Sequence, residues 1–376
     1  MKNTLNQLPV LNIAQPELNH IYNMPVVVIK TINRCNSNCT YCYSNKGELN
    51  KICPGIIKEL FTRFYEYFED FPEARIEIQW HGGEPLLLGE KFYNKVVQLQ
   101  SSILRKYQDN IVHTMQSNLT LLDKPLLSVL SDLKIQSIGT SIEPVPGIRG
   151  IGRCVDSELY MRKLFQAISF LESANIRWGI NYVVTSRSVD IPEKILYYLS
   201  NLSLSEQIVF NPVNVRTAAA LPLKISAHQY VSFLESIYLL RNNDMNMIYG
   251  IEPLNSMKSA AVQIIKGIPL PEQTYETPIV VDGKGNFSYY RSPGNPVGNV
   301  HHDSFHDLII KNEFINYSIT VREKKKRKCL KCALWHVCLA NTVNDSFSQN
   351  EDYLDPEWCN ARKELVLEFL INQKVA

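Results

Sequence analysis

The chain has 376 residues, 45% of them hydrophobic, so it can bury one large core or two ordinary ones. Its 39 basic and 37 acidic residues give a formal net charge of +2, which favours neither a nucleic acid nor a membrane surface as partner. The N-terminal segment lacks the pattern of a signal peptide, and no apolar run reaches the ~20 residues of a membrane helix. We therefore expect a cytoplasmic protein whose nine cysteines stay reduced, with no nucleic-acid or membrane partner.

Strand-like runs alternate with amphipathic helices along the first two-thirds of the chain. The predicted strands are 26–31, 75–80, 111–116, 135–142, 177–184 and 207–213. The predicted helices begin near Pro54 and then cover 92–107, 125–133, 157–171 and 192–199. Repeated strand–helix units imply parallel strands joined by right-handed crossovers. Six units suggest a partial or complete barrel, although periodicity alone does not distinguish a barrel from a flat sheet, and in both ligands bind where strands end.

The pattern changes after a predicted helix at 226–242. A mixed region follows, with a hairpin near Gly283 to Gly285, a basic run at 324–328 and a second group of cysteines. We therefore predict an N-terminal extension over 1–24, a barrel domain over 25–230, and linker helices with a small C-terminal domain over 231–376.

Three cysteines lie directly after the first predicted strand. Cys35, Cys39 and Cys42 have the spacing C-x3-C-x2-C, and Tyr41 places an aromatic residue before the last. Thiolates suit zinc or iron–sulfur clusters, and three of them leave the fourth iron of a [4Fe–4S] cluster open. A zinc site that lacks a protein ligand and chance clustering of buried cysteines are the alternatives. The spacing resembles that of the radical S-adenosylmethionine (SAM) superfamily.

This resemblance implies that one electron from the cluster cleaves SAM, bound at the open iron, to a carbon radical. It also implies contacts with SAM at the ends of the following strands. Gly82, Gly83 and Glu84 resemble the GGEP element that contacts the SAM amino group, although the segment alone reads as a turn. The other expected cofactor contacts are Tyr41, Gln116, Ser117, Asn118, Ser141 and Arg153. Asn118 could equally be a turn residue and Arg153 a surface charge, and Glu143-Pro144 replaces the usual aspartate–glycine after Ser141.

A second cysteine group lies in the last fifty residues. Cys329, Cys332 and Cys338 have the spacing C-x2-C-x5-C, and Cys359 follows. Four thiolates also suit a structural zinc site. Together with the first group, the pattern resembles the SPASM/twitch extension, which implies an auxiliary [4Fe–4S] cluster. Tyr290 and Thr342 stand where full SPASM domains carry further cysteines, so we predict one auxiliary cluster rather than two.

The predicted fold is thus α/β, a partial (β/α)6 TIM-like barrel with a small C-terminal SPASM/twitch domain. The motifs resemble the peptide-modifying branch of the superfamily. We predict a maturase that removes a hydrogen atom from a ribosomally synthesised precursor peptide and forms a carbon–carbon cross-link, such as a cyclophane. An external reductant such as flavodoxin or ferredoxin would supply the electron, and Tyr290 and Arg291 are candidate substrate-side residues.

Three other functions stay open. In anaerobic sulfatase maturases, which form formylglycine, an aspartate beside the hairpin cysteine acts as base. Arg291 occupies that place here and cannot accept a proton at neutral pH. A peptide epimerase is the second alternative, and a zinc-stabilised binding module without redox activity is the third.

Overall fold

The computed structural model describes residues 25–42, 48–152, 155–244, 250–268, 278–289, 295–310, 332, 334 and 356–375. These residues divide into two compact units. The first unit contains the described residues of 25–179 and 278–310, and the second contains those of 180–268 and 332–375. The domain boundaries expected from the sequence stay a prediction.

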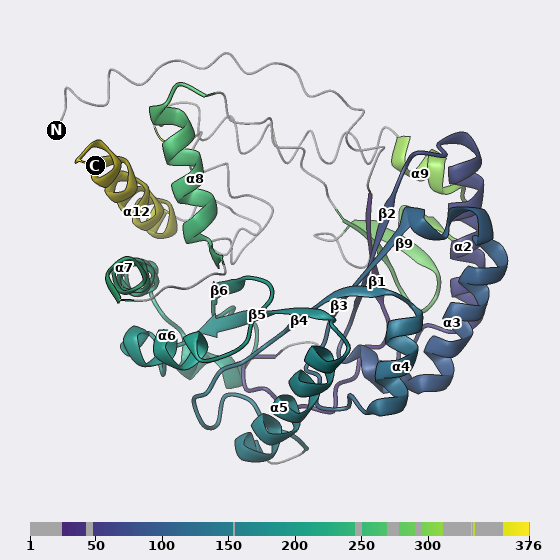
Figure 1. Ribbon diagram of the computed structural model, residues 1–376, viewed down its shortest axis with the longest axis horizontal. Coiled ribbons are helices and arrows are strands. Elements are labelled where there is room, and N and C mark those ends of the chain that lie inside the picture. Colours follow the sequence, from purple (N-terminus) through teal and green to yellow (C-terminus); the bar gives the residue numbers. More distant parts are fainter. Residues whose placement is uncertain are drawn as a thin grey trace. The chain divides into compact units, whose positions relative to one another are not determined.

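The first unit is built on a sheet with four parallel strands in chain order (Figure 1). They are β1 (Val26–Lys30), β2 (Ile76–His81), β3 (Ile111–Gln116) and β4 (Ile135–Thr140). The expected hairpin, formed by β8 (Ile279–Val281) and β9 (Asn286–Tyr289), extends this sheet because β8 pairs in parallel with β1. The short strand β10 (Gly298–Asn299) pairs antiparallel with β9. Residues far apart in the sequence thus flank the strand that leads into the first cysteine group.

Helices α2, α3 and α4 lie along one side of these strands (Figure 1). The helix α2 starts at Pro54, where proline needs no hydrogen-bond partner for its nitrogen, and it buries Leu60 and Phe64 on one face. Alternation along β2 turns Ile78 and Trp80 toward the helices, and both are fully buried. The helical segments are α2 (Pro54–Asp70), η2 (Pro85–Leu88), α3 (Gly89–Ile103), η3 (Arg105–Asn110), α4 (Lys124–Asp132), α5 (Ser157–Ser173) and α9 (Phe305–Ile310).

Among the described residues, the second unit begins at residue 180, within β5, and continues with the strands β6 and β7. The strands β5 (Arg177–Val184), β6 (Ile208–Pro212) and β7 (Ile251–Glu252) pair in parallel. Its helical segments are α6 (Pro192–Ser200), η4 (Ala218–Leu223), α7 (Ala227–Asp244), α8 (Leu254–Ile265) and α12 (Pro356–Val375). The helix α12 packs against α7 and α8, and the rings of Tyr230 and Trp358 lie 5.9 Å apart.

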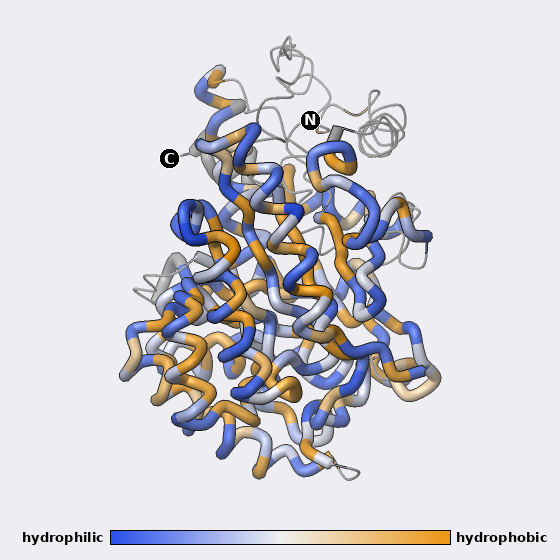
Figure 2. Tube along the Cα trace, turned by 90° about the vertical axis from the view of Figure 1, so that its right-hand side faces the viewer, coloured by the Kyte–Doolittle hydropathy of each residue, from blue (hydrophilic) through white to orange (hydrophobic). Residues whose placement is uncertain are grey.

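The α/β class with parallel strands that do not close into a full barrel is confirmed. All six expected strands are present, and each expected helix has a counterpart within a few residues of its predicted start. No helix in the described part of the chain is long and apolar enough to cross a membrane. Hydrophobic and hydrophilic residues instead alternate along the helices in Figure 2, as amphipathic packing on a sheet requires.

A group of carboxylates between α7 and α12 predicts a pH-dependent stability. Burial, together with the nearby carboxylates of Glu368 and Glu364, raises the pKa of Glu235 to about 7. His228 Nδ1 lies 3.4 Å from Glu364 at the same contact. Because the folded state holds this proton more tightly than the unfolded state, the stabilisation is complete below pH 4.5 and lost as the pH rises through about 7.

We therefore expect wild type to lose more stability between pH 5.5 and pH 8 than the Glu235→Gln variant, which has no proton to release. Urea unfolding at several pH values, followed by tryptophan fluorescence, measures this difference. The exposed Glu193 on α6 supplies the control variant Glu193→Gln, which should follow wild type. Identical pH profiles for wild type and Glu235→Gln would contradict the prediction.

Candidate functional site

The first cysteine group lies on a loop that follows β1 and rests on the end of β2. The backbone N–H of Gly83 donates to the carbonyl of Ile32 over 2.6 Å, and that of Glu84 donates to the carbonyl of Arg34 over 2.9 Å. A Cβ at Gly82, where φ is +143°, would lie 2.6 Å from the Ile32 carbonyl oxygen, and one at Gly83 would overlap the Arg34 carbonyl. The two glycines therefore let the cysteine loop approach β2 directly.

A second segment holds the same loop from another direction. The N–H of Asn38 donates to the carbonyl of Gly150 over 2.9 Å, and that of Thr40 donates to Ile148 over the same distance. The Thr40 hydroxyl also donates to the carbonyl of Gly147 over 2.8 Å. Backbone contacts on both sides thus fix the course of the loop that carries the cysteines.

Protein donors reach the sulfur atoms of Cys35 and Cys39. Cys35 Sγ accepts from Asn118 Nδ2 over 3.5 Å, and Cys39 Sγ accepts from Arg149 Nη1 over 3.5 Å. Cys35 and Cys39 are half-buried, whereas Cys42 is exposed. Burial raises the pKa of the Cys35 thiol to about 11 and also raises that of Cys39. A metal must therefore displace protons from these thiols when it binds.

The cysteine loop carries the ligand type that iron–sulfur clusters use. In a [4Fe–4S] cluster each thiolate binds a different iron, so the sulfur atoms lie further apart than the ligands of one ion. Three cysteines within eight residues, with hydrogen-bond donors at Cys35 and Cys39, suit that arrangement.

Glu84 ties the end of β2 to the end of β3. Its side chain is fully buried and accepts hydrogen bonds from the N–H of Leu86 (3.0 Å), the Ser117 hydroxyl (2.7 Å) and the N–H of Asn118 (2.7 Å). Burial raises the pKa of Glu84, while the three hydrogen bonds counteract that rise. Its expected contact with the SAM amino group stays a prediction.

The Glu84→Gln variant tests the Glu84 junction, by which we mean the three hydrogen bonds to the Glu84 carboxylate between β2 and β3. The new amide group faces N–H donors that it cannot all satisfy, so we expect a loss of about 1–3 kcal/mol in the free energy of unfolding. Urea unfolding of the metal-free protein measures it. Glu90→Gln on α3, where the side chain is exposed, is the matched control and should change little. An unaltered unfolding midpoint in Glu84→Gln would show that the three hydrogen bonds are dispensable.

Asn118 connects β3 to the cysteine loop through side chains. Besides the Cys35 sulfur, its Nδ2 donates to Asn36 Oδ1 over 3.0 Å. The Thr120 hydroxyl donates to Asn118 Oδ1 over 2.7 Å and accepts from Asn36 Nδ2 over 2.8 Å. The closed ring of contacts orients the Asn118 amide with its NH₂ group toward sulfur, which is the orientation a thiolate ligand requires.

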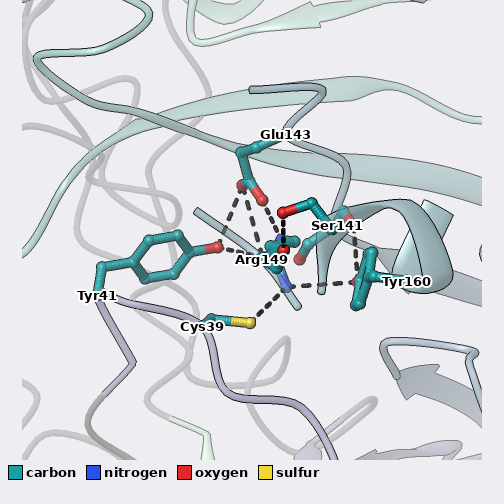
Figure 3. Close-up of polar contacts among 7 residues, drawn as sticks. Cys39, Tyr41, Ser141, Glu143, Arg149 and Tyr160 are labelled. Atoms are coloured by element: carbon teal, nitrogen blue, oxygen red, sulfur yellow. Dashed lines mark hydrogen bonds and ion pairs between the residues drawn. The ribbon is translucent and has the colours of Figure 1, made fainter. Parts of the chain in front are cut away.

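A buried polar cluster lies at the end of β4 (Figure 3). The Arg149 guanidinium pairs with the Glu143 carboxylate and donates to the Tyr41 hydroxyl, which itself donates to Glu143 over 3.2 Å. The Tyr160 hydroxyl donates to the carbonyl of Ser141 over 3.1 Å. Burial lowers the pKa of Arg149, but the Glu143 charge more than offsets this, so Arg149 stays charged.

Sequence reasoning missed Arg149 and Tyr160 and noted Glu143 only as a departure from the family pattern. The sequence did contain a signal for this pair. A glutamate buried at a strand end requires a basic partner, and Arg149 lies six positions after Glu143. Of the residues expected at the site, Asn118 contacts the cysteine loop through Cys35, Ser117 donates to Glu84, and Tyr41, on the loop itself, accepts from Arg149.

Several expected site residues lie elsewhere or cannot be placed. Gln116 is half-buried at the end of β3, and Cys332 and Cys359 are half-buried in the second unit, Cys359 on α12. The others lie outside the described residues: Arg153, Tyr290, Arg291, Cys329 and Cys338. The auxiliary cluster therefore stays a prediction.

Residues 29–146 match the radical SAM superfamily. The matched range contains the cysteine loop and the ends of β2, β3 and β4, so this part of the chain is a radical SAM domain. The resemblance inferred from Cys35, Cys39 and Cys42 is confirmed. A radical SAM domain implies a [4Fe–4S] cluster and SAM as cofactors.

Curated relatives extend the similarity beyond this domain. A cysteine-type anaerobic sulfatase-maturating enzyme of Clostridium perfringens is 22% identical over 354 residues, which are 88% of this chain and 92% of the relative. An uncharacterised Synechocystis protein is 21% identical over 406 residues, covering 99% and 98%. An uncharacterised Methanocaldococcus jannaschii protein is 28% identical over 184 residues, and this chain spans only 58% of its length.

Solved structures share the fold. The structure of anSMEcpe with bound AdoMet and Cp18Cys peptide has a TM-score of 0.70 at 19% identity, covering 94% of this chain and 98% of the other. Streptococcus suis SuiB bound to precursor peptide SuiA has a TM-score of 0.57 at 14% identity, covering 86% and 74%. The fold is the radical SAM partial barrel that these structures share, and residues 29–146 are the part of the chain that matches the radical SAM superfamily.

Proposed function

We propose that this enzyme removes a hydrogen atom from a ribosomally synthesised precursor peptide and installs an oxidative modification, a carbon–carbon cross-link such as a cyclophane. The observation that carries the radical chemistry is the cysteine loop, in which Asn118 and Arg149 donate to the sulfurs of Cys35 and Cys39 within a radical SAM domain. The relationship to peptide- and protein-modifying enzymes along most of the chain supports a peptide substrate.

The residues of the site would have separate roles in binding the cluster, positioning the loop and contacting SAM. Cys35, Cys39 and Cys42 would hold the cluster, which together with SAM supplies a carbon radical able to abstract an unactivated hydrogen. The Gly82-Gly83 segment positions the loop, and the Glu84 junction fixes the strand ends beside it. We propose Tyr41, Gln116, Ser141 and Arg153 as SAM contacts on the basis of the family resemblance.

The names of two structural neighbours are consistent with a peptide as partner. SuiB has been solved with its precursor peptide SuiA, and anSMEcpe with the Cp18Cys peptide. A cross-link requires the peptide to lose two hydrogen atoms, so a second electron must leave the substrate. An auxiliary [4Fe–4S] cluster on Cys329, Cys332, Cys338 and Cys359 is the proposed acceptor, and flavodoxin or ferredoxin in the cytoplasm is the proposed external reductant.

Two measurements test this function. Anaerobic reconstitution with iron and sulfide should give roughly eight irons per chain, the sum of two four-iron clusters, with SAM cleaved under reductant. Co-expression with small open reading frames next to the gene, followed by mass spectrometry, should give a peptide lighter by two hydrogen atoms. Stoichiometric zinc without SAM cleavage would instead identify a binding module.

The same experiment separates the alternatives. The relationship to sulfatase-maturating enzymes over 88% of the chain makes a sulfatase peptide the necessary comparison substrate. Conversion of its cysteine or serine to formylglycine, with neighbouring small peptides untouched, would overturn the cross-linking assignment. Unchanged peptide mass with deuterium uptake from solvent would indicate epimerisation.

A further inference from the structure

A buried ion pair lies against one of the cluster cysteines. Arg149 is 8% exposed and Glu143 is 3% exposed, and the guanidinium and carboxylate are paired. The same guanidinium donates through Nη1 to Cys39 Sγ over 3.5 Å (Figure 3). A buried pair of this kind adds little stability over well-packed hydrophobic side chains, because both charges lose their hydration. Stability alone therefore does not account for its position at the sulfur.

The ion pair of Arg149 and Glu143 has no net charge, but its positive end faces the Cys39 sulfur. The group in contact with the sulfur is the cation, while the Glu143 carboxylate accepts from the Tyr41 hydroxyl over 3.2 Å. The Arg149 guanidinium lies 5.4 Å from the centre of the Tyr41 ring and 5.8 Å from that of Tyr160. These contacts hold the guanidinium plane against Cys39. In a site of low dielectric, the nearer charge dominates the potential at the sulfur.

We propose that Arg149, held in place by Glu143, raises the reduction potential of the cluster bound by Cys35, Cys39 and Cys42. Reduction adds one electron, supplied by the external flavodoxin or ferredoxin, and spreads negative charge over the iron atoms and the thiolates. Hydrogen bonds and positive charge at a ligand sulfur stabilise that reduced state. The inference rests on the proposed function, because it requires a cluster on these three cysteines.

Two side chains donate to sulfur atoms of the cluster cysteines, and they differ in charge. Asn118 donates a neutral hydrogen bond to Cys35, whereas Arg149 brings a full positive charge to Cys39. The charge of Arg149 is permanent, because a guanidinium does not lose its proton in proteins. The potential of the cluster should therefore respond to the charge of this pair with a predictable sign.

Two variants give opposite expected shifts. In Glu143→Gln the counter-charge is lost while Arg149 remains, so the midpoint potential should rise. In the double variant Glu143→Gln/Arg149→Met both charges and the hydrogen bond to Cys39 are lost, so the potential should fall below that of wild type. The exposed pair of Lys134 and Asp109 supplies the control Asp109→Asn/Lys134→Met, which removes the same charges at the surface and should not shift the potential.

The measurement is a redox titration of the full-length reconstituted protein, followed by electron paramagnetic resonance. The signal that changes when SAM is added identifies the cluster with an open iron, apart from any auxiliary cluster. Potentials equal to wild type in both variants would overturn the inference while leaving the proposed function intact. Should the double variant fail to retain iron, Glu143→Gln alone decides, and an unshifted potential there overturns the inference. Absence of a SAM-responsive signal in wild type would instead refute the proposed function.

Discussion

Replacing Cys42 with alanine should reduce SAM cleavage to the level of a reaction without enzyme. Cys42 is exposed, so its removal leaves the packing of the loop intact while taking one of three ligands from the cluster. Reductive cleavage depends on a cluster that can both pass an electron and bind SAM, and a cluster held by two thiolates would be lost or disordered. Quantifying 5′-deoxyadenosine released under reductant measures the effect, together with iron content and the absorbance of the cluster.

A second exposed cysteine provides the control. Cys53 precedes the first turn of α2 and makes no side-chain capping hydrogen bond there, so Cys53→Ala should retain full activity and iron content. The complete test replaces Cys35, Cys39 and Cys42 together. If that variant still releases deoxyadenosine at the wild-type rate, these residues do not hold the SAM-cleaving cluster and the proposed function fails.

Introducing a methyl group at Gly83 should destabilise the metal-free protein by about 3 kcal/mol, at the upper end of overpacking effects. The added Cβ of Gly83→Ala would overlap the backbone carbonyl of Arg34, and backbone cannot move aside as a flexible side chain can. The cysteine loop must shift away from β2, which breaks the hydrogen bonds from Gly83 to Ile32 and from Glu84 to Arg34. We expect lower iron loading as well, because the sulfur positions depend on this contact.

Urea unfolding of Gly83→Ala and iron analysis after reconstitution measure both effects. Gly267, which follows α8, has φ of +68° but nothing within 4 Å of an added Cβ. Gly267→Ala therefore isolates the cost of the left-handed backbone, about 1–2 kcal/mol, without any steric overlap and without loss of iron. Equal destabilisation of the two variants would show that contact with the cysteine loop is not what requires glycine at position 83.

The regular part of the fold was predictable because it depends on local periodicity. The strand at 111–116 and the helix that starts at Pro54 were expected from their own residues, and the turn before Asn286 from its glycines. The parallel pairing of β8 with β1 was not predictable from one sequence, since periodicity carries no information on which distant strands meet. The two-residue strand β7 is too short to show any period.

The part of the candidate site that could be predicted is the part in which the chemistry fixes the spacing of residues along the chain. Cys35, Cys39 and Cys42 are recognisable from sequence because one cluster constrains their separation along the chain. The roles of the glycines were only partly foreseen: Gly82 and Gly83 accommodate the cysteine loop itself, a contact between two segments that only a folded structure reveals. Arg149 has no motif around it, and its place beside Cys39 follows from how the segment at 147–150 pairs with the loop.

The pairing of β1 with β8 has a consequence for synthesis of the protein. One edge of β1 is covered by β8 through contacts such as Val27 with Ile279, so this edge stays uncovered by its described partner until residue 279 has left the ribosome. Exposed edges of this kind invite mispairing in nascent chains. The loop that follows β1, by contrast, contacts residues 83–84 and 147–150, which are synthesised before β8, so it can form these contacts while that edge of β1 is still open.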